Sequence, residues 1–159
     1  EKIIKNIKLY NLALSNKDNE TVLKLPIRSS SIFKDNIEEL YQLGAASIHP
    51  NNEFKNYKKV RVNTEKLDNL SINNIGFIKI DVEGHELEVI EGAKKTIITN
   101  KPILLIEIEK RHSKRSVEET ISFINNLNYE CYFVKDEDLR PIVELNDKNL
   151  VNNFFFLPK

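Results

Sequence analysis

Acidic side chains stand at the ends of two strands that the sequence predicts to be neighbours in one sheet. Asp81 and Glu83 close a predicted strand over residues 77–82, and Glu107 lies near the end of one over residues 103–108. In an open parallel sheet, ligands bind at the carboxyl ends of the strands. A carboxylate that ends an apolar strand is costly to bury unless it meets a partner or a ligand. Asp81 is therefore predicted to be a functional residue.

The same three acids could instead hold a divalent metal. Asp81, Glu83 and Glu107 offer the hard oxygen ligands that Mg²⁺ and Mn²⁺ prefer. Zinc is less consistent with the sequence, because one cysteine and three scattered histidines give no pair at helical spacing. The chain has no Gly-x-Ser-x-Gly, Walker A or Gly-x-Gly-x-x-Gly motif. A metal-dependent hydrolase or phosphoryl-transfer enzyme therefore remains an alternative.

Other polar residues near Asp81 have simpler explanations. Glu86 and Glu88 fall in the first turn of a predicted helix, where acids stabilise the helix dipole. His85 comes between the strand and that helix, where a solvated loop is expected.

Alternating strands and helices must position these residues. Apolar spacing predicts strands over residues 7–14, 21–25, 60–62, 77–82, 103–108, 129–134 and 153–157, helices near 33–41, 86–99 and 116–127, and a helical turn near 64–70. The first two strands would form a hairpin. Ser116 and Glu119 form a capping box at the start of the last helix. This order predicts an α/β fold with a parallel sheet, whose last two strands could pair antiparallel at one edge.

The composition of the chain argues against several classes of protein. The 159 residues suit a single domain over 1–159, and 24 basic residues balance 24 acidic ones, which argues against a nucleic-acid partner. No apolar run approaches the ~20 residues that a membrane-spanning helix needs. A single cysteine, Cys131, and the lack of a secretory signal favour the cytoplasm. The chain has no methionine and begins at Glu1, which predicts either that an N-terminal segment was removed or that the chain is an excerpt of a longer protein.

The run Ile78-Lys79-Ile80-Asp81-Val82-Glu83-Gly84-His85-Glu86 resembles the FkbM family of S-adenosylmethionine-dependent methyltransferases. The resemblance extends in order along most of the chain, through weaker matches at Asn11–Ser15, Gly44–Ser47, Leu67-Asp68, Gly92-Ala93, Pro102–Glu107 and Asn153–Pro158. It implies a Rossmann-like, mostly parallel sheet with antiparallel edge strands. The family's Asp-x-Gly-Ala-Asn-x-Gly cofactor loop has no match here, so the N-terminal strands are expected to be missing. The strand over 77–82 would then have an unpaired edge, through which the chain could form a homo-oligomer.

The resemblance also implies roles for individual residues. The whole protein would transfer a methyl group from S-adenosylmethionine to a hydroxyl of a sugar or secondary metabolite, so its partner would be a small-molecule or glycan acceptor rather than a nucleic acid or a membrane. The catalytic residues would be Asp81, Glu83 and Glu107, and the cofactor contacts Asn11, Ala13 and Asp81. Residues 28–57 would cap the pocket as a substrate-selecting insert, with Ser47, His49 and His85 as acceptor contacts. A non-catalytic binding or assembly domain is a further alternative.

Overall fold

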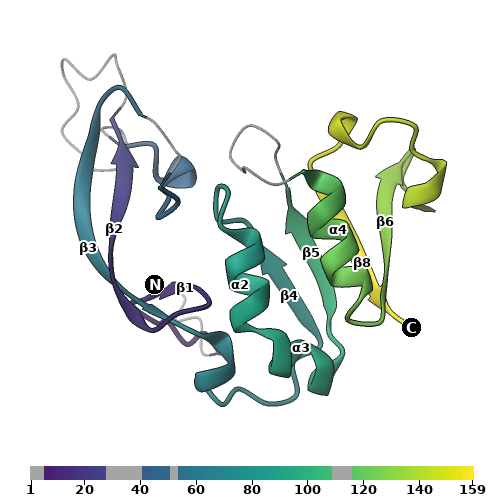
Figure 1. The fold of residues 1–159 in the computed structure, drawn as a ribbon, viewed down its shortest axis with the longest axis horizontal. Coiled ribbons are helices and arrows are strands. Elements are labelled where there is room, and N and C mark those ends of the chain that lie inside the picture. The colour runs from purple at the N-terminus through teal and green to yellow at the C-terminus, as the bar shows by residue number, and fades with distance from the viewer. Residues whose placement is uncertain (1–5, 28–40, 51–53, 109–115) are drawn as a thin grey trace.

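The computed structural model describes residues 6–27, 41–50, 54–108 and 116–159, which form a mixed α/β fold with two sheets (Figure 1). Strands β1 (Ala13–Leu14), β2 (Asn19–Pro26) and β3 (Tyr57–Glu65) make a three-stranded sheet in the order β1-β3-β2. Strands β4 (Phe77–Ile80), β5 (Ile103–Glu107), β6 (Tyr129–Lys135), β7 (Asp138–Pro141) and β8 (Asn153–Pro158) make a five-stranded sheet in the order β4-β5-β8-β6-β7. The α-helices are α2 (Glu86–Gly92), α3 (Lys94–Asn100) and α4 (Val117–Asn125). Four 3-10 turns are η1 (Leu43–Ala45), η2 (Leu67–Asn69), η3 (Ile142–Glu144) and η4 (Lys148–Leu150).

The predicted hairpin between the first two strands is wrong. β3 lies between β1 and β2, pairing parallel with β1 and antiparallel with β2. The strand expected over 7–14 shrinks to two residues, and the side chains of Ile7 and Leu9 are 61% and 89% exposed. β3 is longer than the predicted run over 60–62, and its two edges offer a hydrogen-bonding partner to each of the other strands.

In the larger sheet the prediction of parallel neighbours is confirmed for β4 and β5. The expectation of a mostly parallel sheet holds only in part, because β8 lies between β5 and β6 and runs antiparallel to both. The connection between β6 and β8 contains no α-helix that could cross over the sheet, so the chain returns antiparallel. β7, which the sequence prediction did not include, pairs with β6 through a tight turn at Asp136 and Glu137, both with positive φ.

The helix predicted over 86–99 is interrupted at Ala93, which leaves the helical region at φ −109° and ψ 4°. The carboxylate of Asp68 in η2 then accepts hydrogen bonds from the backbone amides of Lys95 and Thr96 at 3.0 and 2.8 Å. These bonds satisfy amide groups at the start of α3 that have no partner within the helix. A side chain distant in the sequence therefore caps α3.

The capping box of α4 forms as predicted. The amide of Glu119 donates to the Ser116 hydroxyl, and the Ser116 amide donates to the Glu119 carboxylate. The helix is slightly shorter than expected, because Asn126 already serves as its C-cap.

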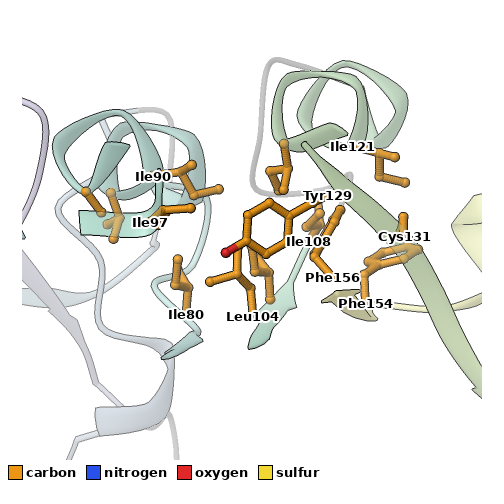
Figure 2. Packing of buried hydrophobic residues seen from close by; sticks show 14 of the residues in the cluster. Ile80, Ile90, Ile97, Leu104, Ile108, Ile121, Tyr129, Cys131, Phe154 and Phe156 are labelled. Carbon is orange, nitrogen blue, oxygen red and sulfur yellow. The ribbon is translucent and has the colours of Figure 1, made fainter. Parts of the chain in front are cut away.

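The core lies between the helices and one face of the five-stranded sheet (Figure 2). Leu104 on β5 and Phe156 on β8 are register partners, as are Ile106 and Phe154, and all four are fully buried. The opposite face is less covered in the described residues, where Phe77 and Ile103 are 52% and 40% exposed. The sheet is thus packed mainly on one side.

Two sequence predictions fall partly or wholly outside the described residues. The short helix near 33–41 and much of the predicted insert over 28–57 coincide with 28–40 and 51–53. Within the described ranges, none of the helices has the length and apolar character needed to cross a membrane.

Candidate functional site

The turn after β4 carries the acids predicted to be functional. Glu83 and Gly84 both have positive φ, at 52° and 94°, so the chain reverses tightly before α2. The amide of Gly84 donates to Glu86 Oε1 at 2.8 Å, and the Glu86 side chain is buried. Burial is the main cause that raises the pKa of Glu86. The buried Glu86 side chain therefore stabilises this turn through a hydrogen bond, and Glu86 is also the first residue of α2.

Asp81 directly follows β4 and pairs with Lys79 of that strand. Its Oδ2 lies 2.6 Å from Lys79 Nζ, with the two side chains 34% and 52% exposed. The hydrogen bond with Asp81 is the largest cause that raises the pKa of Lys79, and the charge of Glu107 adds to it. Asp81 thus meets the partner expected of it, but at an exposed position, so the desolvation cost that drew attention to it is small.

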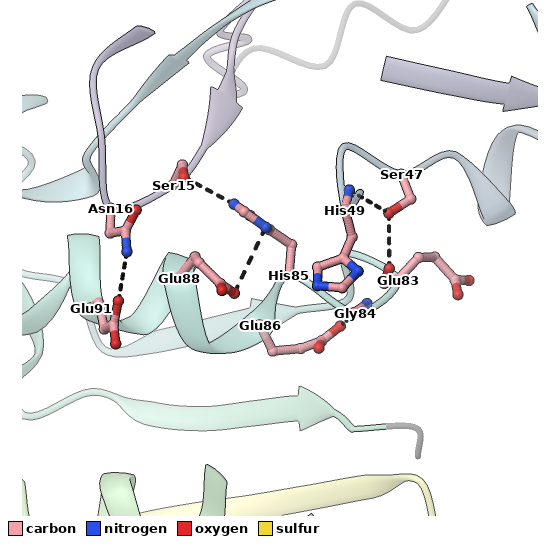
Figure 3. Close-up of polar contacts among 10 residues, drawn as sticks. All are labelled: Ser15, Asn16, Ser47, His49, Glu83, Gly84, His85, Glu86, Glu88 and Glu91. Atoms are coloured by element: carbon pink, nitrogen blue, oxygen red, sulfur yellow. Dashed lines mark hydrogen bonds and ion pairs between the residues drawn. The ribbon is translucent and has the colours of Figure 1, made fainter. Parts of the chain in front are cut away.

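His85 is packed between the two sheets rather than solvated, and the expectation of a solvated loop is wrong. Its side chain is 12% exposed, and Nε2 lies 2.9 Å from the hydroxyl of Ser15 just after β1 (Figure 3). Its Nδ1 is buried and has no hydrogen-bond partner, with Glu88 Oε2 at 3.7 Å. Burial lowers the pKa of His85, Glu88 opposes that shift and His49 adds to it. Burial therefore favours the neutral imidazole at pH 7.

Ser47 and His49 approach the same turn from the segment 41–50. The Ser47 hydroxyl donates to the backbone oxygen of Glu83 at 2.8 Å and accepts from the amide of His49 at 3.0 Å. The ring of His49 lies edge-on to that of His85, with 6.3 Å between centroids. Figure 3 shows Ser47 and His49 approaching the turn from the same side, with the ring of His85 beside that of His49.

A hollow of about 260 Å³ lies between the open edge of β4 and the segment around β1. Its wall is mostly apolar, and its ionisable members are Lys79, Asp81 and His85. The apolar lining residues are Leu12, Ala13, Leu14, Leu23, Ala46, Ile48, Leu67, Ile78, Ile80, Val82, Val89 and Ala93. β4 pairs only with β5 among the described strands, so the unpaired edge expected for this strand is present beside the hollow.

The hollow brings together some of the predicted site residues and leaves others outside its wall. Asp81, Ala13 and His85 line it. The other predicted residues, Asn11, Ser47, His49, Glu83 and Glu107, are not among its lining residues. The roles predicted for all these residues stay predictions.

The metal alternative is not supported by the described part of the chain. Within residues 6–27, 41–50, 54–108 and 116–159, no three histidine, cysteine or acidic side chains are grouped so that they could hold a metal ion. Asp81, Glu83 and Glu107 follow neighbouring strands, as predicted, but they do not form a ligand set.

Sequence reasoning missed two residues of this site. Lys79 could have been found, because residues two apart on a strand point to the same face and a lysine there can reach Asp81. Ser15 could not, because it lies 70 residues from His85 and only the tertiary fold brings the two together.

Comparison with known proteins agrees with the resemblance in the sequence. The chain matches the methyltransferase FkbM domain over residues 2–131. A solved structure, methyltransferase FkbM from Methylobacillus flagellatus KT, is 20% identical with a TM-score of 0.44, over 61% of this chain and 23% of that one. The chain therefore spans about a quarter of the length of that structure. No curated protein matches the chain. Since the family match covers most of the residues, the chain belongs to the FkbM methyltransferase domain family.

Proposed function

We propose that the protein containing this chain transfers a methyl group from S-adenosylmethionine to a hydroxyl oxygen of a sugar or secondary metabolite. Membership of the FkbM methyltransferase domain family supports methyl transfer over a non-catalytic module. The observation that carries the assignment of the site is the position of Asp81, whose carboxylate lies at the carboxyl end of β4 in the wall of the hollow. In open α/β sheets this is where ligands bind.

The described residues can handle a proton at this position. We propose that Asp81 would accept the hydroxyl proton of the acceptor, whose oxygen would gain the methyl group that S-adenosylmethionine would release on becoming a neutral thioether. Lys79 is an ammonium at neutral pH, and the Asp81 carboxylate raises its pKa further, so it can donate a hydrogen bond to an acceptor oxygen. A positioned proton acceptor is worth about 10²–10⁴-fold in rate. Alignment of the methyl donor with the acceptor oxygen supplies much of the remaining rate enhancement.

The residues present fit only part of S-adenosylmethionine. Asp81 offers a negative charge to the sulfonium side, and the apolar wall beside Ala13 offers contact with a ring. The hollow of about 260 Å³ is below the ~300–1,000 Å³ typical of small-molecule sites, so it would hold a portion of the cofactor. When bound, S-adenosylmethionine supplies an electrophilic methyl group. We expect the 159-residue chain alone to bind it weakly or not at all, which calorimetry would test.

The remaining expectations belong to the same proposal. The segment 28–57 would select the acceptor, and the open edge of β4 would pair with a strand from outside these residues or from a second copy. Burial of the lone thiol of Cys131 is compatible with the proposed cytoplasmic location.

Incubation of the whole protein with S-adenosylmethionine carrying a labelled methyl group, and with a panel of hydroxylated sugars and secondary metabolites, tests the proposal. The expected result is label on an acceptor oxygen, lost in Asp81→Asn. A parallel melting experiment with Mg²⁺ and Mn²⁺ tests the rival chemistry, because a ligand that binds only the native state raises Tm. No labelled acceptor together with a higher Tm in either metal would contradict methyl transfer and favour the rival.

A further inference from the structure

The hydroxyl of Ser47 sits where three segments of the chain meet. Ser47 is 1% exposed, and its Oγ donates to the backbone oxygen of Glu83 at 2.8 Å. The same oxygen accepts from the amide of His49 at 3.0 Å. A hydroxyl has a single proton to donate, and here that proton is used on the turn after β4.

Ser47 is itself fixed to the three-stranded sheet. Its backbone forms an isolated antiparallel bridge with Lys24 of β2, with N–O distances of 2.9 and 3.2 Å for the two bonds. The position of its side chain is therefore set by β2 and not by a freely moving loop. The Ser47–Glu83 bond thus connects the three-stranded sheet to the turn after β4.

The turn that accepts this bond has an uncommon backbone conformation. The backbone of Glu83 has φ 52°, in a region that residues other than glycine seldom adopt, and Gly84 follows with φ 94°. Such a conformation persists only when its surroundings hold it in place. On one side the Glu83 oxygen is bound by Ser47, and on the other the Gly84 amide is bound by Glu86.

We propose that Ser47 is a positioning residue, whose hydroxyl holds the Glu83–Gly84 turn and thereby sets the direction of Asp81. Asp81 lies two residues before Glu83 in the chain, so a displacement of this turn would displace Asp81 as well. The inference rests on the proposed function only in treating Asp81 as part of the active site. It also replaces the predicted role of Ser47 as a direct contact to the methyl acceptor, because the side chain is buried and its proton is already donated to Glu83.

Amide hydrogen exchange and the carboxyl ¹³C resonance of Asp81, both measured by NMR on the 159-residue chain, test the proposal. In Ser47→Ala the Glu83 oxygen loses its donor, and the amides of His49 and Gly84 should exchange about tenfold faster beyond any global change in stability. The Asp81 resonance should move as well. Ser47→Thr keeps the hydroxyl and should retain most of the wild-type protection.

Thr120→Val is the matched control, because it removes a buried hydroxyl from α4. It should change neither the exchange of Gly84 nor the Asp81 resonance, even if its Tm falls as far. Unchanged exchange at Gly84 in Ser47→Ala, or the same change in Thr120→Val, would overturn the proposal. If Ser47→Ala does not fold, Ser47→Cys decides, since a thiol is a weak donor: faster exchange at Gly84 supports the proposal and wild-type exchange overturns it. These measurements need no methyl transfer, so an inactive protein with a normal Ser47 response would count against the proposed function alone.

Discussion

The backbone oxygen of Ser15 lies against Gly92, in the space that a β-carbon at residue 92 would occupy. This close approach brings the end of β1 onto α2, and it places the Ser15 hydroxyl within reach of His85. A second contact in the same place, between Asn16 Nδ2 and Glu91 Oε2 at 2.6 Å, fixes the segment further. The packing of the three-stranded sheet against the helices therefore depends on a residue without a side chain.

Gly92→Ala should destabilise the chain strongly. The added methyl group meets backbone atoms of Ser15 and Asn16, which cannot rotate away, so the segment must shift. Overpacking of this kind costs about 1–3 kcal/mol or more in the free energy of unfolding, measurable by urea denaturation. Gly76→Ala is the control, because a β-carbon there would meet no atom within 4 Å apart from its own residue and the two adjacent ones, and it should be neutral or slightly stabilising. Equal stability of the two variants would show that the Ser15 contact yields easily.

Asp68→Ala should weaken α3 through the loss of its cap. The carboxylate accepts from two backbone amides that would otherwise lack a partner, and loss of such a cap costs about 0.5–2 kcal/mol. Thermal melting with circular dichroism measures the effect. Asp138→Ala removes an aspartate whose ion pair with Arg140 is largely exposed, and it should cost less than about 1 kcal/mol. If Asp138→Ala is the more damaging change, the capping role of Asp68 is wrong.

Stability should fall as the pH drops below about 6.5, in part because of His85. Burial lowers the pKa of His85 from its ordinary value of 6.5, so the unfolded chain binds a proton in a range where the folded chain does not. The contribution of His85 to the free energy of unfolding is fully present above pH 6.5, and it is lost as the pH falls toward the pKa of His85 in the folded chain. Urea unfolding should show that the free energy of unfolding falls more between pH 7.5 and pH 5.5 in the wild type than in His85→Gln. Identical losses would mean that His85 titrates alike in both states.

Asp81→Asn separates a chemical role of this residue from a structural one. The change keeps shape and polarity, and the native side chain is partly exposed, so the melting temperature should stay nearly constant. If Asp81 accepts the acceptor proton, turnover by the whole protein should fall about 10²–10⁴-fold. Glu118→Gln, in the first turn of α4, is the control and should keep full activity. Wild-type turnover in Asp81→Asn would assign the carboxylate to the scaffold.

Cys131 should be inert in the folded chain. It is 1% exposed, and burial raises the pKa of its thiol to about 12, so the reactive thiolate is scarce at neutral pH. A colorimetric thiol reagent should label it slowly in buffer and rapidly in urea. Labelling at equal rates would place Cys131 at the surface.

Several elements could be predicted because their signals are local. The Ser116 and Glu119 capping box lies within a few residues of the helix that it starts, and it forms as expected. The apolar runs over 77–82 and 103–108 predicted two neighbouring parallel strands, and β4 and β5 pair in parallel. The run that contains Asp81 and Gly84 indicated the family to which the chain belongs. Spacing and residue type along a short stretch carry this information.

Only the tertiary structure decided what depends on partners distant in the sequence. The partner of β1 is β3 and not β2, because a strand pairs with whichever edge the fold brings beside it. The helix is interrupted at Ala93, where Asp68 caps the start of α3 and Ser15 approaches Gly92. The local sequence around Ala93 indicates neither contact. The contact between His85 and Ser15 joins residues 70 positions apart, and the open edge of β4 results from the order of the strands in the sheet. Sequence periodicity shows which face of an element is apolar, but the neighbour that covers that face is chosen by the free energy of the whole fold.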